Sequence, residues 1–320
     1  MKILLLGGSG FVGRAIVRAA QSLEDDTLRV RVLLRDQNAL PEHALLEKQV
    51  GELSQLPAEL EPDEPYVLVH FAVKQIDHDR TGFSAINVDA NRRLEHQLSD
   101  RLQGVIYGSS MSVYGSQAQE GISEHTLPAP ATALARSRHQ AESLWLEAAE
   151  RRKISGYVLR PRFVLGHGDR FVMPGLASAY ARGLLPGSGQ QRFSIIDVDD
   201  YARIVLQLAE RCLSGVHPGG VRRPLNVAYE QPVSMDEIVD ALRVARPRER
   251  RIHRVPATPG WLRALRLFGG RRGEALTTRL ELLGLSHWAQ VDALRAEVGS
   301  SIIERDPRIC LQAAVAGLGD

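Results

Sequence analysis

The sequence predicts an α/β protein built on a doubly wound parallel sheet, with a smaller lobe on its C-terminal side. Short apolar, β-rich segments alternate with helical patterns through the first half of the 320-residue chain. This alternation is typical of parallel strands joined by crossover helices, which cover both faces of the sheet. A hydrophobic content of 44% also allows a chain of this length to bury a large core.

The same two patterns predict the elements in order along the chain. The first strand is the apolar segment 2–6, and the amphipathic pattern behind it predicts a helix over 11–23. The other expected strands are 28–34, 48–50, 66–72, 104–109 and 156–160, and the other expected helices are 39–46, 82–101 and 132–152. Right-handed crossovers would place a ligand at the carboxyl ends of the strands.

A glycine-rich turn joins the first strand to the first helix. Gly7 stands where the chain must turn sharply, Gly10 lets a ligand approach the backbone, and Gly13 lets the helix pack closely on the strand. The N-terminus of the helix offers unpaired N–H groups to phosphates. The turn therefore predicts a Rossmann-type dinucleotide-binding fold, and the alternative is an ordinary turn between a strand and a helix.

The pattern loosens from about residue 165, where glycine and proline become frequent and short strands alternate with helices. We expect residues 1–165 to form an NAD(P)-binding Rossmann domain, with further strands of its sheet returning near 192–228. Residues 166–320 are expected to form mainly a substrate-binding lobe.

Composition excludes several other classes of protein. The formal net charge is only +2 and charges of both signs are interspersed, so neither nucleic acid nor a membrane surface is an expected partner. No stretch approaches the roughly 18 apolar residues of a membrane span. Cys212 and Cys310 lie far apart without metal-type spacing, which predicts a reducing compartment, no disulfide and no metal site. We expect a cytoplasmic protein with a small-molecule substrate.

The end of the second strand predicts which dinucleotide is bound. An acidic residue there would accept hydrogen bonds from the adenosine ribose, whereas an arginine matches the 2′-phosphate of NADP. Arg35 follows the strand 28–34, and Arg14 lies just past the third glycine. We therefore expect NADP(H). NAD remains possible if the strand ends one residue later, because Asp36 would then take this position.

Further motifs follow in order along nearly the whole chain. They are Gly51-Glu52-Leu53, Val69-His70-Phe71-Ala72, Asn87-Val88, Tyr107-Gly-Ser-Ser-Met-Ser-Val-Tyr-Gly115, Leu159-Arg-Pro-Arg-Phe-Val-Leu-Gly-His-Gly-Asp169, Val198-Asp-Asp-Tyr-Ala202 and Leu225-Asn-Val227. Together with the glycine turn, they resemble the extended short-chain dehydrogenase/reductase family, also described as NAD(P)-dependent epimerases and dehydratases. This family includes enzymes that act on nucleotide sugars as well as reductases for ketones, aldehydes and steroid-like molecules.

The resemblance implies a set of cofactor-binding residues. These are Gly7, Ser9, Gly10, Phe11, Val12, Gly13, Arg14, Arg35, Glu52, Leu53, Phe71, Ala72, Val73, Arg138, Pro161 and Phe163. Within the set, Glu52 takes the place of the family's acidic residue that faces the adenine.

The resemblance breaks at the catalytic residues. The family combines a Ser or Thr with a Tyr and a Lys four residues apart, where the lysine lowers the pKa of the tyrosine and the tyrosine exchanges a proton with the substrate. Ser110 matches the hydroxyl position and Ser112 is its neighbour, but Leu134 stands in place of the tyrosine and Arg138 in place of the lysine. No other tyrosine is followed by lysine four residues later.

Three hypotheses follow from this departure. The chain is a reductase whose proton comes from another group, for which Ser110, Ser112, Tyr107, His139, Lys74 and water are the candidates. Lys74 enters this list because it follows the cofactor-facing segment 71–73. Alternatively, catalysis is lost and the protein is an NADP(H)-binding sensor or interaction protein, or the same cleft serves an epimerase, dehydratase, isomerase or cyclase.

Substrate and oligomeric state are predicted from the same resemblance. Phe163 stands where nucleotide-sugar enzymes usually carry Asn, and Phe163 and Met173 would give the cleft apolar walls. Arg192 lies close to the position of a diphosphate-binding arginine, which keeps a nucleotide sugar open. Relatives pair the helices matching 82–101 and 132–152, which predicts a homodimer through the apolar residues Val88, Leu94, Leu98, Leu144, Leu146 and Ala148.

Overall fold

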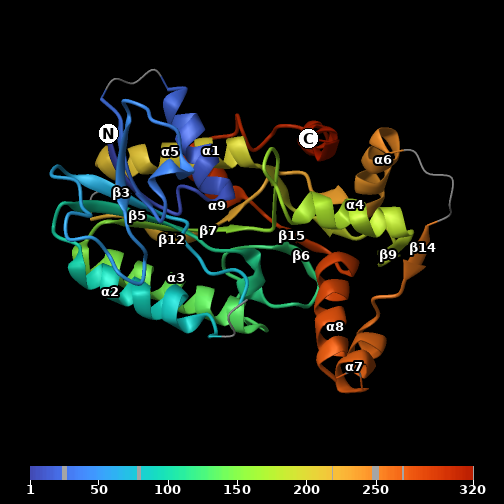
Figure 1. The fold of residues 1–320 in the computed structure, drawn as a ribbon. Coiled ribbons are helices and arrows are strands. Elements are labelled where there is room, and N and C mark those ends of the chain that lie inside the picture. The colour runs from blue at the N-terminus through green and yellow to red at the C-terminus, as the bar shows by residue number, and fades with distance from the viewer. Residues whose placement is uncertain (24–26, 78–80, 218, 247–251, 269, 320) are drawn as a thin grey trace.

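A seven-stranded parallel sheet forms the centre of the computed structural model, which describes residues 1–320 except 24–26, 78–80, 218, 247–251, 269 and 320 (Figure 1). Its strand order is β12-β7-β5-β4-β1-β2-β3. The strands are β1 (Lys2–Leu6), β2 (Arg29–Leu34), β3 (Leu46–Val50), β4 (Tyr66–His70), β5 (Leu102–Gly108), β7 (Ser155–Pro161) and β12 (Arg222–Val227). Every pair of neighbours is parallel. The predicted doubly wound α/β fold is confirmed.

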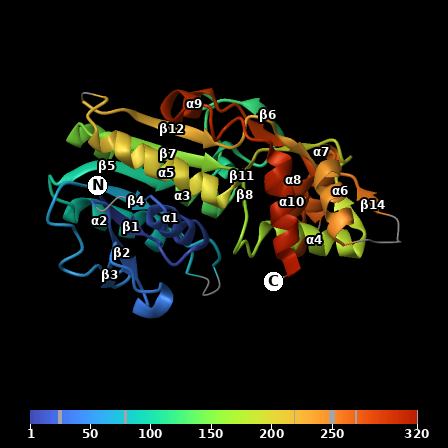
Figure 2. The same ribbon diagram turned by 90° about the horizontal axis from the view of Figure 1, so that it is seen from above.

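Helices cover both faces of this sheet, as Figures 1 and 2 show. Helices α1 (Phe11–Gln21), α5 (Val198–Leu213) and α9 (Asp292–Val298) lie on one face, and α2 (Ala90–Gln97) and α3 (Ala133–Arg152) lie on the other. Because all seven strands run in one direction, the turn after β1 and the ends of β4, β5 and β7 meet at one edge. We call this the carboxyl edge of the sheet.

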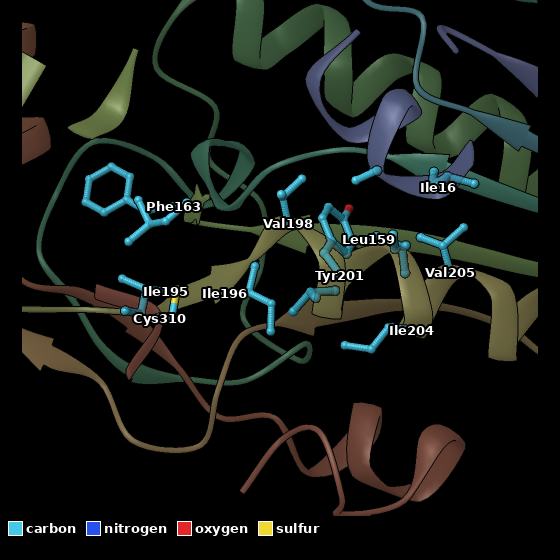
Figure 3. Packing of buried hydrophobic residues seen from close by; sticks show 14 of the residues in the cluster. Ile16, Leu159, Phe163, Ile195, Ile196, Val198, Tyr201, Ile204, Val205 and Cys310 are labelled. Carbon is cyan, nitrogen blue, oxygen red and sulfur yellow. The ribbon is translucent and has the colours of Figure 1, made fainter. Parts of the chain in front are cut away.

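The larger core lies between the sheet and helices α1 and α5. Figure 3 shows Val198, Tyr201 and Val205 of α5 near Leu159 of β7 and Ile16 of α1, and each of these side chains is at most 1% exposed. A side chain buried to this extent contributes about 1.5–3 kcal/mol relative to an exposed one. The apolar face of α5 therefore holds this helix, and the first turn that carries Tyr201, against the carboxyl edge.

The C-terminal lobe is assembled from short strands and helices. It contains β8 (Phe163–Leu165), α4 (Val172–Arg182), β9 (Leu184–Pro186), β10 (Arg192–Phe193), β11 (Ile195–Asp197), β13 (Val233–Ser234), α6 (Met235–Ala245), β14 (His253–Val255), α7 (Pro259–Phe268), α8 (Gly270–Gly284), β15 (His287–Ala289) and α10 (Pro307–Ala316). One of its sheets has the order β13-β10-β15-β6, where β6 (Gln119–Ile122) comes from the N-terminal half. Strand β12 returns from this part of the chain to the main sheet. The division at residue 165 stays a prediction.

Two predicted helices are corrected by the structure. Residues 39–46 do not form a helix, because only a short 3₁₀ turn at Gln37–Ala39 precedes Pro41, whose ring fixes φ and removes an N–H donor, and β3 begins at Leu46. The helix predicted over 82–101 is shorter. It consists of a π-helical turn, Ala85–Asp89, followed by α2, and it ends at Gln97 because Leu98 has extended backbone angles.

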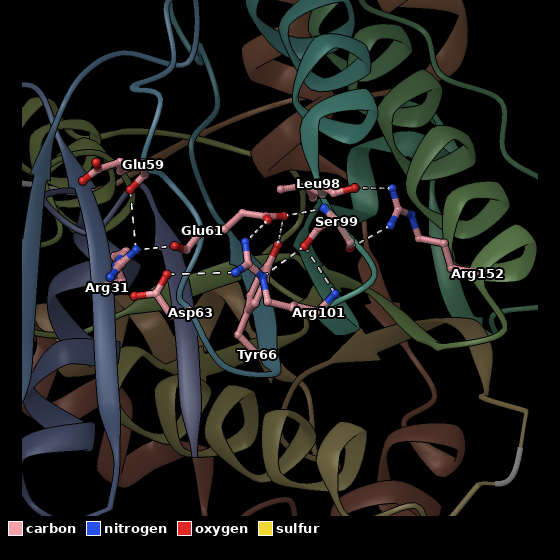
Figure 4. Close-up of polar contacts among 9 residues, drawn as sticks. All are labelled: Arg31, Glu59, Glu61, Asp63, Tyr66, Leu98, Ser99, Arg101 and Arg152. Carbon is pink, nitrogen blue, oxygen red and sulfur yellow. Dashed lines mark hydrogen bonds and ion pairs between the residues drawn. The ribbon is translucent and has the colours of Figure 1, made fainter.

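The opposite edge of the sheet, where the strands begin, is closed by ionic contacts (Figure 4). One Glu61 oxygen accepts from the Tyr66 hydroxyl at 2.7 Å and from the Ser99 N–H at 2.6 Å, and the other accepts from Arg101 at 2.9 Å. Burial raises the pKa of Glu61, but these hydrogen bonds outweigh it and hold the pKa below its usual value. Arg152 of α3 donates to the Leu98 carbonyl at 2.8 Å. These contacts tie β4, β5 and α3 together far from the glycine turn.

The apolar residues predicted for a dimer lie mostly inside the protomer. Val88, Leu94, Leu98 and Ala148 are at most 6% exposed, while Leu144 and Leu146 are partly buried. These residues pack toward the sheet, and the outward residues of α2 are polar. Dimerisation stays a prediction, but these buried side chains are not available for its interface.

Among the described residues, no helix is both long and apolar enough to cross a membrane.

Candidate active site

The turn after β1 has no room for a Cβ atom at Gly7 or at Gly13. Gly7 has a φ of +86°, and a Cβ there would lie 2.7 Å from the Ala72 nitrogen. A Cβ on Gly13 would lie 2.1 Å from the Gly7 carbonyl oxygen, and the Gly10 N–H donates to that same oxygen at 3.0 Å. The three glycines thus let β1, α1 and the segment after β4 meet at the carboxyl edge.

The N-terminus of α1 is open to an anion. Its N-cap residue, Gly10, has no side chain to satisfy the first N–H groups, and the first turn carries no acidic residue. Arg14 is exposed in this turn, and its Nε donates to the Ser9 carbonyl at 2.9 Å. Free N–H groups, the positive end of the helix dipole and a cradle that a Cβ would fill are what a pyrophosphate requires. These residues fit the dinucleotide predicted from the sequence.

The end of β2 places Arg35 and Asp36 differently. The strand ends at Leu34, so Arg35 is the first residue beyond it, and its side chain is exposed. Asp36 is also exposed, but its carboxylate accepts from the Asn38 N–H at 2.9 Å and caps the following turn. Arg35 is therefore the residue that follows the strand directly, as the preference for NADP(H) assumed.

The next two strands also end at this edge. After β3, Glu52 is exposed and Leu53 is buried. After β4, Phe71, Ala72 and Val73 are each partly buried. Glu52 is thus the polar residue of this group, and the segment 71–73 is apolar and follows β4 at the carboxyl edge.

The buried Asn87 holds the segment after β4 in place. Its Oδ1 accepts from the Lys74 N–H at 2.8 Å, and its Nδ2 donates to the Lys74 carbonyl at 3.1 Å and to the Ser137 hydroxyl at 3.0 Å. Asn87 lies in the π-helical turn, a local distortion that is frequent at functional sites. One side chain therefore joins the loop that follows Phe71 to helix α3.

The two serines predicted as catalytic lie together where β5 ends. Ser110 caps the 3₁₀ turn Met111–Tyr114, and its Oγ accepts from the Ser112 N–H at 3.2 Å. Both side chains are partly buried. Because that bond uses only one lone pair of Ser110, its O–H group remains able to donate to a ligand oxygen.

Arg138 reaches the same edge from α3. Its Nη1 donates to the Ser109 carbonyl at 2.9 Å, and the residue is only 8% exposed, so that burial lowers its pKa. Leu134 lies one helical turn before it and is partly buried. Arg138 is thus placed as a cation beside Ser110, while the position that precedes it supplies no proton.

Other candidate proton donors are less well placed. The Lys74 ammonium lies 2.8 Å from an Asp77 oxygen and donates to the Thr81 hydroxyl at 2.8 Å. His139 lies 3.4 Å from a Glu142 oxygen. Tyr107 is completely buried, and burial raises the pKa of its phenol well above the usual value.

A buried network supports the two serines, and its role was not predicted from the sequence. The guanidinium of Arg160 donates to Glu142 through Nε at 3.0 Å and through Nη2 at 2.5 Å, and its Nη1 donates to the Tyr114 hydroxyl at 3.0 Å. That hydroxyl donates to Asn226 at 2.9 Å. The network links α3, β7 and β12 to the turn that Ser110 begins. Arg160 and Asn226 lie in motifs recognised in the sequence, but nothing in the sequence named their partners.

The side of the edge nearest the lobe is apolar. Pro161 is buried, and the ring of Phe163 lies 5.3 Å from that of Phe193, centroid to centroid. Met173 is 1% exposed. Arg192, by contrast, is exposed and lies with its guanidinium 4.6 Å from the centroid of the Trp288 ring. Phe163, Phe193 and Met173 are at most 5% exposed, so these side chains pack in the core and do not form the open apolar walls predicted for Phe163 and Met173.

Comparison with known proteins gives a family and a fold. The model of the NAD dependent epimerase/dehydratase family matches residues 3–228. The chain is 26% identical over 174 residues to the uncharacterized protein y4nG of Sinorhizobium fredii, covering 53% of this chain and 42% of that protein, so it spans less than half of that relative's length. It is 25% identical over 226 residues to GDP-6-deoxy-D-talose 4-dehydrogenase of Aggregatibacter actinomycetemcomitans, covering 67% and 71% of the two chains.

Solved structures share the fold over nearly the whole chain. UDP-glucuronic acid 4-epimerase from Bacillus cereus, in complex with NAD, superposes with a TM-score of 0.76 at 17% identity and covers 100% of this chain and 99% of that one. dTDP-glucose 4,6-dehydratase from Bacillus anthracis, also with NAD, gives 0.72 at 18% identity, with coverage of 100% and 96%. At such identities the likeness shows the fold alone.

Proposed function

The chain belongs to the NAD dependent epimerase/dehydratase family, and from this membership we propose that it is an NADP(H)-dependent oxidoreductase acting on a carbonyl or hydroxyl group of a small molecule. One observation carries the proposal: the Ser110 hydroxyl and the Arg138 cation lie at the end of β5, on the same edge as the open glycine turn. A dinucleotide-binding turn beside a hydroxyl and a cation is an arrangement suited to holding a reacting oxygen.

The bound dinucleotide would supply hydride transfer. The N–H groups of residues 11–13 would hold its pyrophosphate, Arg35 and Arg14 its 2′-phosphate, and Arg138 the ribose next to the nicotinamide. Arg138 remains charged throughout, so it stabilises negative charge but does not deliver a proton. Ser110 would donate a hydrogen bond to the substrate oxygen, and the proton itself would come from Ser112 or water, since Leu134 has none to give.

Replacing Arg35 tests the choice of dinucleotide. Arg35→Ala should weaken NADPH binding by about tenfold or more, because a charge-assisted hydrogen bond to phosphate contributes about 1.5–3 kcal/mol. NADH binding should change little, since NADH lacks that phosphate. Fluorescence titration of both nucleotides measures this, with Arg92→Ala on the exposed face of α2 as the control. Equal losses for NADPH and NADH would refute the role of Arg35.

Replacing Ser110 tests the reaction. Reduction of a panel of ketones, aldehydes and sugar nucleotides, followed by NADPH absorbance, should reveal a substrate. Ser110→Ala should then lower kcat/KM on the order of a hundredfold, because the reacting oxygen loses its positioned donor. Ser22→Ala, an exposed serine next to the C-terminal end of α1, should leave activity unchanged. Activity of Ser110→Ala at the wild-type level would remove Ser110 from the reaction.

A second function is supported by the helix α3 itself. Leu134 cannot exchange a proton, and the Arg138 guanidinium already donates to the Ser109 carbonyl. Both features suit a protein that binds NADP(H) without turning it over. Tight NADPH binding together with no turnover across the whole panel would favour this binding protein over the oxidoreductase.

A further inference from the structure

Arg162, at the edge of the proposed active site, is a cation that has no counter-charge among the described residues. It follows β7 directly, between Pro161 and Phe163, and its side chain is partly buried. Its Nη2 donates to the Leu282 carbonyl near the C-terminal end of α8 at 3.1 Å, and its guanidinium lies 5.2 Å from the centroid of the Phe163 ring. Within the part of the chain that the structure describes, its Nε has no hydrogen-bond partner and no carboxylate lies within ion-pair distance.

This lack of a partner is costly at Nε, the Arg162 atom that is removed from water. Burial lowers the pKa of Arg162 to about 9, so the side chain is still charged at neutral pH but less favourably than in solvent. Arg160, two residues earlier, is also buried, but its guanidinium forms an ion pair with Glu142. A negatively charged group beside Arg162 would restore the interactions that burial has taken away.

The neighbouring histidine does not supply that negative charge. His287 is 1% exposed, and burial, followed by the charge of Arg162, lowers its pKa to about 3. Its imidazole is therefore neutral at neutral pH. Because the Glu281 carbonyl can only accept, the Nε2–H of His287 is the donor of the 2.9 Å bond between them. The described surroundings of Arg162 thus contain a neutral ring, a carbonyl and aromatic side chains.

We propose that Arg162 binds a carboxylate of the substrate, which would make the substrate an organic acid. The carboxylate would lie on the Arg162 guanidinium, which already donates one hydrogen bond to the Leu282 carbonyl. The partial exposure of Arg162 leaves the guanidinium within reach of a ligand. The identification of this ligand as the substrate rests on the proposed oxidoreductase function, whereas the anion site itself does not.

Binding of benzoate and of its neutral analogue benzamide to the whole protein tests the site without any turnover. Saturation-transfer NMR or calorimetry should detect benzoate but not benzamide. Arg162→Gln should weaken benzoate at least tenfold, because one charge-assisted bond contributes about 1.5–3 kcal/mol. Arg162→Lys should retain part of the affinity. Arg243→Gln, an exposed arginine on α6 in the same lobe, should behave as wild type.

The Gln variant also separates binding from a structural role at the end of α8. The Gln variant loses the Nη2 bond to the Leu282 carbonyl, but that contact is exposed, so unfolding temperatures of the Gln and Lys variants only slightly below that of wild type are expected. Equal binding of benzoate by wild type and Arg162→Gln, or no preference for benzoate over benzamide, would overturn the proposal. If no ketone, aldehyde or sugar nucleotide of the panel, 4-carboxybenzaldehyde included, is reduced while benzoate binding still depends on Arg162, the oxidoreductase fails and the anion site stands.

Discussion

Gly13→Ala is expected to abolish tight dinucleotide binding. The added Cβ would lie 2.1 Å from the Gly7 carbonyl oxygen, and because that oxygen belongs to the backbone, α1 and the turn must move apart. Two or more N–H bonds to phosphate would be lost, each contributing about 1.5–3 kcal/mol, which weakens NADPH on the order of a hundredfold to ten thousandfold. Titration of intrinsic or NADPH fluorescence measures the loss.

A second glycine provides the control for this substitution. Gly175 lies in α4 and is exposed, and a Cβ added there would have no heavy atom within 4 Å beyond its own helix backbone and chain neighbours. Gly175→Ala should therefore bind NADPH normally and be slightly more stable, since alanine favours a helix by about 1 kcal/mol over glycine. Wild-type affinity in Gly13→Ala would mean that the turn does not hold the pyrophosphate.

Glu142→Gln is expected to destabilise the protein by about 3–5 kcal/mol, because it leaves the Arg160 charge buried and unpaired. The side chains of Arg160 and Glu142 are 5% and 1% exposed. Chemical denaturation followed by circular dichroism measures the change, and Glu147→Gln on the exposed side of the same helix should change stability by less than about 0.5 kcal/mol. Replacing both partners, as in Glu142→Leu with Arg160→Met, should recover much of the loss.

The pH dependence of stability provides an independent measure of this pair. Burial raises the pKa of Glu142, but hydrogen bonds from His139 and Arg160 and the Arg160 charge outweigh it, so the folded pKa lies below the usual value of 4.5. The resulting stabilisation is fully present above the unfolded pKa and is lost as the pH falls through the folded one. Acid unfolding of Glu142→Gln should therefore be less steep below about pH 4.5. A profile parallel to wild type would contradict the paired state.

The fold was predictable because its signals are local. Apolar runs such as 66–70, alternating with amphipathic helices, predict a parallel sheet whatever lies around them, and the glycine turn marks the edge where a ligand binds. The segments 39–46 and 82–101 were predicted less well. Buried residues such as Leu40 and Leu45 also occur in a connection that lies over the sheet, and the end of α2 depends on contacts with β5 and α3 that no local pattern records.

The positions of the site residues were predictable from the sequence, but the groups to which they bond were less so. Arg35, Ser110 and Arg138 reach the carboxyl edge as their places in the motifs indicate. The partners of Lys74 and Arg138, which are Asp77 and the Ser109 carbonyl, depend on how loops and helices approach each other in space. Arg162 was overlooked for the same reason, since an unpaired cation is recognised only when its surroundings are known.

The bonds made by Asn87 have a mechanical consequence for the pocket. The amide of Asn87 bonds to the backbone of Lys74 on one side and to Ser137 of α3 on the other, so one side chain of 0% exposure joins the two segments directly. Neighbouring residues such as Leu134 can therefore be replaced while Asn87 still joins the two segments. New chemistry can then arise at this site by substitution of those residues alone.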